Sequence, residues 1–162
     1  GSEMCIRDSD KVDENIQRLM DDMLETMYAA PGIGLAAIQV GVPKRIIVLD
    51  ISYKEGQKNP IFIINPEIIK KSENNSTYEE GCLSVPGQFA EIDRPDKCHI
   101  KYLDYYGKIQ EIKAEGMLAT CIQHEMDHLE GILFIDYLSK LKRSMISKKL
   151  SKQKKELERI VV

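Results

Sequence analysis

The chain has 162 residues and a formal net charge of −3, with 43% hydrophobic and 30% charged residues. This is the composition of one globular domain with a buried core, so it excludes a disordered or fibrous chain. No apolar run approaches the roughly 20 residues that a membrane span requires. The four cysteines form no CxxC pair, and residues 1–11 lack the pattern of a secretion signal. We therefore expect free thiols and a cytoplasmic protein.

Hydrophobic periodicity in the first half of the chain predicts one helix and two strands. Residues 13–30 carry apolar side chains at three- and four-residue spacing, as one face of a helix does, and Pro31-Gly32 ends this pattern. Runs of β-branched residues predict strands, and polar stretches predict loops. The expected elements are a helix at 13–30, strands at 45–51 and 61–64, and loops at 52–60 and 71–77.

The second half predicts a hairpin followed by two helices. Residues 99–104 and 108–113 alternate in polarity around Tyr105-Tyr106-Gly107, which is typical of a β-hairpin. Residues 116–130 return to helical spacing, with Gly131 as the C-terminal cap. Residues 139–160 predict a last helix that is strongly basic.

These elements predict an α+β fold in which mostly antiparallel strands pack around a central helix, with a further helix near each terminus. Three parts are expected along the chain. Residues 1–12 have no periodicity, and we interpret them as a disordered or cloning-derived leader. Residues 13–138 would form the catalytic domain, and residues 139–162 the basic C-terminal helix.

The central helix carries the sequence His124-Glu125-Met126-Asp127-His128. Residues four apart lie on the same helical face, so the two imidazoles can bind one metal ion. Glu125 beside them can act as a general base. The predicted central helix would therefore bear a metal. The alternative is a polar helix face that holds two histidines by chance.

A catalytic metal needs a third protein ligand and one open position. Cys82 is the better candidate, because a thiolate is a strong ligand for divalent transition metals and Gly81 permits close backbone approach. The alternative is a buried structural thiol. His99 lies in the predicted hairpin with no motif around it, and we expect it to be a surface or packing residue.

A third segment is rich in small residues: Gly32-Ile33-Gly34-Leu35-Ala36-Ala37-Ile38-Gln39. Its glycines and alanines indicate that backbone comes close to another group, and the Gln39 amide can donate a hydrogen bond. Tight packing after a helix would also explain the pattern. The segment lacks the sequence of a phosphate-binding loop.

In this order, the three segments resemble the signature motifs of peptide deformylases, GxGxAAxQ, EGCxS and HExDH, and match them at every specified position. The resemblance extends from about residue 13 to about residue 140. It implies that Cys82, His124 and His128 bind the metal. It also implies that Glu125 moves the proton and that Gln39 and the Leu83 backbone N–H stabilise the oxyanion.

The reaction that the resemblance implies is removal of the N-terminal formyl group from the formylmethionine of nascent polypeptides. The family uses one ferrous ion, and Zn²⁺, Ni²⁺ or Co²⁺ can take its place. The peptide would be bound as an added strand, with the methionine side chain in a pocket. The expected substrate-binding residues are Ile33, Gly34, Leu35, Glu80, Gly81, Met117 and Cys121. Of these, Glu80 could instead have a structural role, held by a basic partner such as Arg94.

The basic C-terminal helix would dock on the ribosome, as the resemblance implies, by binding RNA phosphates. A solvated helix face is the alternative. We expect no membrane and no DNA partner.

Two other functions fit parts of the sequence. A zinc metallopeptidase of the HExxH type shares the helix motif, but such enzymes take a third ligand downstream. No histidine follows His128, although Glu130 and Asp136 do. A catalytically inactive homologue that binds RNA or the ribosome is the second alternative, and it would have no chemical need for Glu125.

Overall fold

The structure, a computed structural model, describes residues 11–82, 85–132, 134–138 and 140–160. Residues 1–10 of the predicted leader lie outside this part. The helices are α1 (Glu14–Ala29), α2 (Gly116–Leu129) and α3 (Lys140–Ile160), and the 3-10 turns are η1 (Ala37–Val40), η2 (Tyr53–Glu55) and η3 (Phe134–Tyr137). The strands are β1 (Gly34–Ala36), β2 (Ile46–Leu49), β3 (Ile61–Lys71), β4 (Asn75–Cys82), β5 (Val85–Pro95), β6 (Lys97–Leu103) and β7 (Ile109–Glu115). Among the described residues, no helix is long and apolar enough to cross a membrane.

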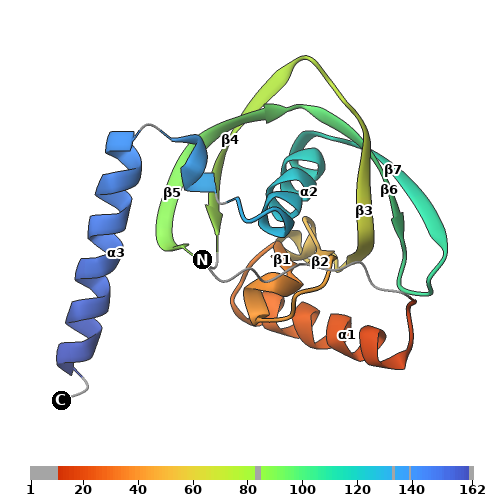
Figure 1. Ribbon diagram of the computed structural model, residues 1–162, viewed down its shortest axis with the longest axis horizontal. Coiled ribbons are helices and arrows are strands. Elements are labelled where there is room, and N and C mark those ends of the chain that lie inside the picture. Colours follow the sequence, from red (N-terminus) through yellow and green to blue (C-terminus); the bar gives the residue numbers. More distant parts are fainter. Residues whose placement is uncertain (1–10, 83–84, 133, 139, 161–162) are drawn as a thin grey trace.

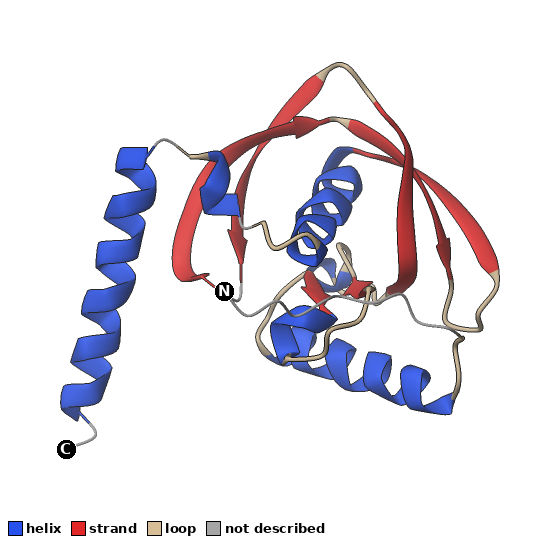
Figure 2. Cartoon of the chain, in the orientation of Figure 1, coloured by secondary structure: helices blue, strands red, loops and turns tan. Residues whose placement is uncertain are grey.

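Five strands form an antiparallel sheet in the order β1-β2-β3-β6-β7, and β4 and β5 form a separate two-stranded ribbon. The strands surround α2, while α1 packs on the outside of the sheet (Figures 1 and 2). α3 lies on the outer side of β5 (Figure 1) and packs on it through Ile146. This arrangement confirms the predicted α+β fold with a central helix and a helix near each end.

β2 is buried on both faces and separates two parts of the core. Ile46 and Val48 pack with the buried methionines of α1, whereas Ile47 and Leu49 pack with the apolar residues of α2. Successive side chains of a strand point to opposite faces, so a strand covered by helices on both sides is apolar throughout. The continuous apolar run of this strand is therefore a consequence of its place between α1 and α2.

The predicted loop at residues 71–77 is wrong. β3 extends to Lys71 and β4 begins at Asn75, so only three residues separate the two strands. Most side chains of β4 are exposed or half-buried, so its sequence is polar. It therefore lacks the apolar alternation from which a strand is predicted. Its strand conformation comes instead from antiparallel pairing with β5, from Asn75 opposite Pro95 to Cys82 opposite Val85.

The buried Asp50 connects α1 to the loop after β2 and, through its backbone, to the residue before β1. Asp50 is completely buried directly after β2, and it accepts hydrogen bonds from Tyr28 Oη at 2.6 Å and Asn59 N at 2.9 Å. The backbone N–H and the hydroxyl of Ser52 both donate to its other oxygen at 3.0 Å. Burial by itself raises the pKa of Asp50, but these hydrogen bonds outweigh burial and hold the pKa below its usual value. The Asp50 backbone N–H also donates to Ile33 O at 2.8 Å.

We expect Asp50→Ala to lower the free energy of unfolding by about 3 kcal/mol at pH 7, because it leaves buried donors without an acceptor. The native pKa is lower than the unfolded one, so the contribution of the carboxylate is complete above the unfolded value of about 3.9. It is lost as the pH falls through the native pKa, so wild type and variant converge in acid. Urea denaturation at several pH values measures the difference in the free energy of unfolding between wild type and variant. Asp22→Ala, at an exposed position of α1, is the control; equal losses from the two variants would contradict the prediction.

Candidate active site

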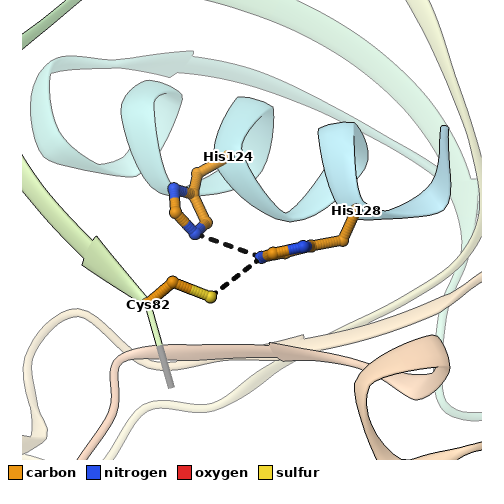
Figure 3. A group of neighbouring side chains, drawn as sticks. All are labelled: Cys82, His124 and His128. Carbon is orange, nitrogen blue, oxygen red and sulfur yellow. Dashed lines mark hydrogen bonds between the residues drawn. The ribbon is translucent and has the colours of Figure 1, made fainter. Parts of the chain in front are cut away.

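Cys82, His124 and His128 converge where β4 ends beside α2. Cys82 is the last residue of β4, and the two histidines lie one turn apart on the face of α2 that points toward it (Figure 3). Cys82 Sγ lies 3.2 Å from His128 Nε2, and that nitrogen lies 3.2 Å from His124 Nε2. The fold thus brings a sulfur atom to two nitrogen atoms from a helix that begins more than 30 residues later, at Gly116.

These separations fit a divalent transition metal. Metal–nitrogen bonds near 2.0–2.1 Å and metal–sulfur bonds near 2.3 Å put neighbouring ligand atoms of a tetrahedral site about 3.4–3.6 Å apart. All three candidate ligand atoms lie within 4.8 Å of one another. Three protein ligands leave a fourth position open, as a catalytic site requires.

His124 is held by a buried carboxylate. Its Nδ1 lies 2.8 Å from Glu80 Oε1, so with Nδ1–H donating to Glu80 the Nε2 lone pair faces the cluster. Glu80 in turn accepts two hydrogen bonds from Arg94, at 2.7 Å from Nε and 2.9 Å from Nη2. Arg94 is thus the basic partner suspected for Glu80 from the sequence, and the Glu80 carboxylate faces these two residues.

The surroundings of the cluster favour a cation. Burial by itself would lower the pKa of His124, but hydrogen bonds to Cys82 and Glu80 raise it to about 10. An environment that stabilises a positive imidazolium also stabilises a metal cation, and the two compete for the same nitrogen.

Glu125 lies beside the cluster and is buried, with 4% of its surface exposed. Burial raises its pKa to about 7. Its Oε2 has no hydrogen-bond partner among the described residues. A Cβ on Gly34 would lie 2.7 Å from Glu125 Oε1, so a side chain at this position would displace the carboxylate. The absence of a side chain at Gly34 is therefore part of the site.

The amide of Gln39 is fixed at both ends. Its Oε1 accepts a hydrogen bond from Ala36 N at 2.9 Å, and its Nε2 donates to Cys82 Sγ at 3.3 Å. The acceptor end is thus occupied by backbone, and the donor end is directed at the cluster. Such a preorganised donor is what an oxyanion-stabilising group requires.

A cleft of about 690 Å³ opens beside these residues. Its wall includes Cys82, His124 and Glu125, so two of the three candidate ligands and the candidate base face one space. The expected substrate-binding residues Ile33, Gly34, Glu80, Gly81, Met117 and Cys121 also line it.

The family described as Polypeptide deformylase matches residues 3–144. The chain belongs to the polypeptide deformylase family. It is 68% identical over 153 residues to the peptide deformylase of Pelagibacter ubique, a match that covers 94% of this chain and 88% of that relative. The peptide deformylase of Rhizobium meliloti is 57% identical over 144 residues, which cover 89% of this chain and 83% of the relative.

Solved deformylases share the fold as well as the sequence. The crystal structure of the Ehrlichia chaffeensis enzyme has a TM-score of 0.88 and 45% identity, and covers 94% of this chain and 90% of the other. A peptide deformylase from Legionella pneumophila has a TM-score of 0.88 and 46% identity, with 96% and 90% covered. The chain is thus a metal-dependent deformylase, and the family acts on formylmethionyl peptides.

Of the expected substrate-binding residues, Leu35 is the exception, whereas His99 lies outside the cluster as expected. Leu35 is buried among the residues that pack against α1 and does not line the cleft. Leu83 lies outside the described residues. His99 lies in β6, with Nε2 3.8 Å from Glu111 Oε1, and is no part of the deformylase metal cluster.

Sequence reasoning missed several residues of the deformylase cleft. Phe89 lines it although 64% of its surface is exposed, and it lies opposite Gly81 in the β4–β5 pair. A Cβ on Gly81 would meet the Phe89 ring at 2.5 Å, so this glycine makes room for an aromatic ring. Tyr78 and Lys54 also line the cleft. No motif includes these residues, and only strand pairing brings Phe89 to Gly81.

We expect Gly34→Ala to lower kcat at least tenfold, because the added methyl group displaces the Glu125 carboxylate, and displacement of about 1 Å can cost 10²-fold in rate. Metal content and the midpoint of thermal unfolding should change little, since neither the ligands nor the apolar core is altered. Steady-state kinetics, metal analysis and calorimetry measure the three quantities. A variant with wild-type kcat would contradict the tight packing of Gly34 on Glu125.

Proposed function

We propose that this chain removes the formyl group from the N-terminal formylmethionine of nascent polypeptides, with Cys82, His124 and His128 as the ligands of one divalent ion. The observation that carries the proposal is the convergence of these sulfur and nitrogen atoms beside the buried carboxylate of Glu125. An HExxH peptidase would require a third ligand after His128. The contact of His128 with Cys82 supports the deformylase ligand set instead.

Cys82, His124 and His128 would hold a divalent ion, which would lower the pKa of a bound water toward neutrality and so supply a nucleophile near pH 7. Glu125 accepts the proton of the attacking water, whose oxygen forms a bond to the formyl carbon. The Gln39 amide donates to the formyl oxygen as that oxygen becomes negative. The carbon–nitrogen bond then breaks as Glu125 returns the proton to the departing amine. The products are a free amino terminus and formic acid, which keeps the second proton of the water until it ionises to formate.

Two strand edges at the cleft support binding of an extended peptide. β1 and β4 each have one paired edge among the described strands. Because Asp50 N–H donates to Ile33 O, the alternation of an antiparallel ladder directs the polar backbone groups of Gly34 to the unpaired edge. A substrate strand between Gly34 and the Glu80–Cys82 segment would pair with both. Ile33, Met117 and Cys121 would then surround the methionine side chain.

For the ion in the cell we propose Fe²⁺, with Zn²⁺, Ni²⁺ and Co²⁺ as ions that the same ligands accept. Cys82 brings negative charge to the ion and is open to oxidation, so anaerobic preparation is needed. Metal analysis of chain purified without oxygen tests this proposal. Zinc in place of iron under those conditions would contradict it.

The decisive activity measurement uses chain loaded anaerobically with Fe²⁺ or Ni²⁺ and a formyl-Met dipeptide. We expect rapid release of formate, and a loss of at least 10²-fold in Glu125→Gln, which keeps the shape of the side chain but removes the base. Metal content should be unchanged in this variant. No release from folded, metal-loaded wild type would overturn the proposal, and cleavage of internal peptide bonds would favour the peptidase. Actinonin, which is in complex with a relative from Ehrlichia chaffeensis, offers an independent inhibition test.

We further propose that α3 docks on the ribosome, in the cytoplasm where nascent chains emerge. Ile146 packs with Val85 and Ile92 of β5, so an apolar contact attaches the helix to the ribbon. Lys148, Lys149 and Lys152 are exposed, and clustered lysines bind RNA phosphates.

We expect glutamine at Lys148, Lys149 and Lys152 together to weaken ribosome co-sedimentation at low salt and to leave formate release from dipeptides unchanged. The charge of the helix changes while Ile146 stays in place. Glutamine at the exposed lysines Lys101, Lys108 and Lys113 is the matched control. Equal binding by both triple variants would contradict a docking role for α3, as would unchanged binding after deletion of residues 142–162.

A further inference from the structure

Asp127, inside the helix motif, is directed away from the cluster of ligands. Its Oδ2 accepts a hydrogen bond from Arg94 Nη1 at 2.7 Å and another from Tyr137 Oη at 2.6 Å. It is absent from the group of candidate metal ligands. Asp127, although part of the helix motif, therefore contacts Arg94 and Tyr137 and not the candidate metal ligands.

Tyr137 touches the same arginine with its ring. The Arg94 guanidinium carbon lies 4.9 Å from the ring centroid, within the distance of a cation–π contact. Arg94 is 4% exposed, whereas Tyr137 is 49% exposed. The ring thus covers one face of a buried cation, and its hydroxyl binds the carboxylate that pairs with that cation.

A continuous chain of contacts leads from Tyr137 to a metal ligand. Tyr137 donates to Asp127, Asp127 pairs with Arg94, Arg94 binds both oxygens of Glu80, and Glu80 accepts from His124. Each link joins different elements: η3, α2, β5 and β4. A buried arginine with two carboxylate partners has little freedom, because losing either contact leaves charge uncompensated in the interior.

We propose that Tyr137 is a positioning residue for His124, and that it acts through Asp127, Arg94 and Glu80. The hydroxyl fixes Asp127, the ring shields Arg94 from water, and the bidentate pair then holds Glu80 at the Nδ1 of His124. Outer partners of ligating histidines affect both metal affinity and activity. Tyr137 lies at the end of η3, shortly before α3, so the segment that leads to the basic helix is joined to the metal site. This inference rests on the proposed ligand set.

The test compares two variants of Tyr137 in their binding of Co²⁺ alone. Tyr137→Phe removes the hydroxyl and keeps the ring, and Tyr137→Ala removes both. We expect Co²⁺ to dissociate about threefold faster from the first and about tenfold or more faster from the second. The visible absorption of bound Co²⁺ should change shape, because the orientation of His124 changes. With dipeptide substrate and Ni²⁺ in the chain, kcat should fall while KM stays constant, since Tyr137 is no part of the cleft wall.

Tyr105→Phe is the matched control, because Tyr105 also donates to an aspartate, Asp21, at 3.1 Å but lies in the β6–β7 turn. It should leave Co²⁺ dissociation and the spectrum unchanged. Asp127→Asn should resemble Tyr137→Ala, and the double variant with Tyr137→Phe should lose no more than Asp127→Asn alone, since both act along one path.

Tyr137 variants that only lower the unfolding midpoint, with wild-type Co²⁺ spectrum and dissociation, would overturn the positioning role and leave the proposed function intact. Wild-type chain that fails to bind Co²⁺ through Cys82 would overturn the ligand set itself. Loss of Co²⁺ binding in Cys82→Ser with retention in Tyr105→Phe separates these two failures.

Discussion

The ion pair between Arg94 and Glu80 connects the parts of the molecule that form the site. Arg94 is on β5, Glu80 is on β4, and His124 on α2 is bound to the same carboxylate. All three are buried, so their charges interact in a region with little water and the geometry of each contact is strict. Because Cys82 lies two residues beyond Glu80 on the same strand, the contact that orients His124 also places the sulfur atom.

The ribbon and the helix contribute different properties to the chemistry. α2 supplies two histidines and Glu125 at fixed helical spacing, with most of its last three turns buried. β4 supplies Cys82 from a strand whose neighbouring edge is open to the cleft. In the proposed function, a rigid helix would hold two of the three metal ligands and the base, while an unpaired strand edge would offer the backbone groups that an extended peptide needs. The fold would thus combine a fixed reaction centre with a peptide-binding edge.

Two glycines contribute to this site through their lack of a side chain. Gly34 lies against Glu125, so that a side chain there would displace the carboxylate, and Gly81 lies against the ring of Phe89. Gln39, at the end of the same segment as Gly34, reaches Cys82 because its carbonyl end is bound by Ala36. The backbone of the glycine-rich segment therefore comes close to the carboxylate that we propose as the base. The alternative interpretation, tight packing after a helix, also fits Gly34, but it does not say that the packing partner is Glu125.

The sequence by itself determined the candidate metal-binding face, because helical spacing is local. His124 and His128 must share a face wherever α2 lies, with Glu125 directly after His124 in the chain. Terminal helices, the β6–β7 hairpin and the α+β class also followed from periodicity. Only the tertiary structure decided the rest. β4 is polar and gained its strand conformation from pairing with β5. Arg94 was suggested from the sequence as a partner of Glu80, but its contact with Asp127, and that of Tyr137, join different elements of the fold. Phe89 enters the cleft for the same reason. Long-range strand pairing and buried ion pairs leave no periodic signal in a sequence, because only the fold brings the paired residues together.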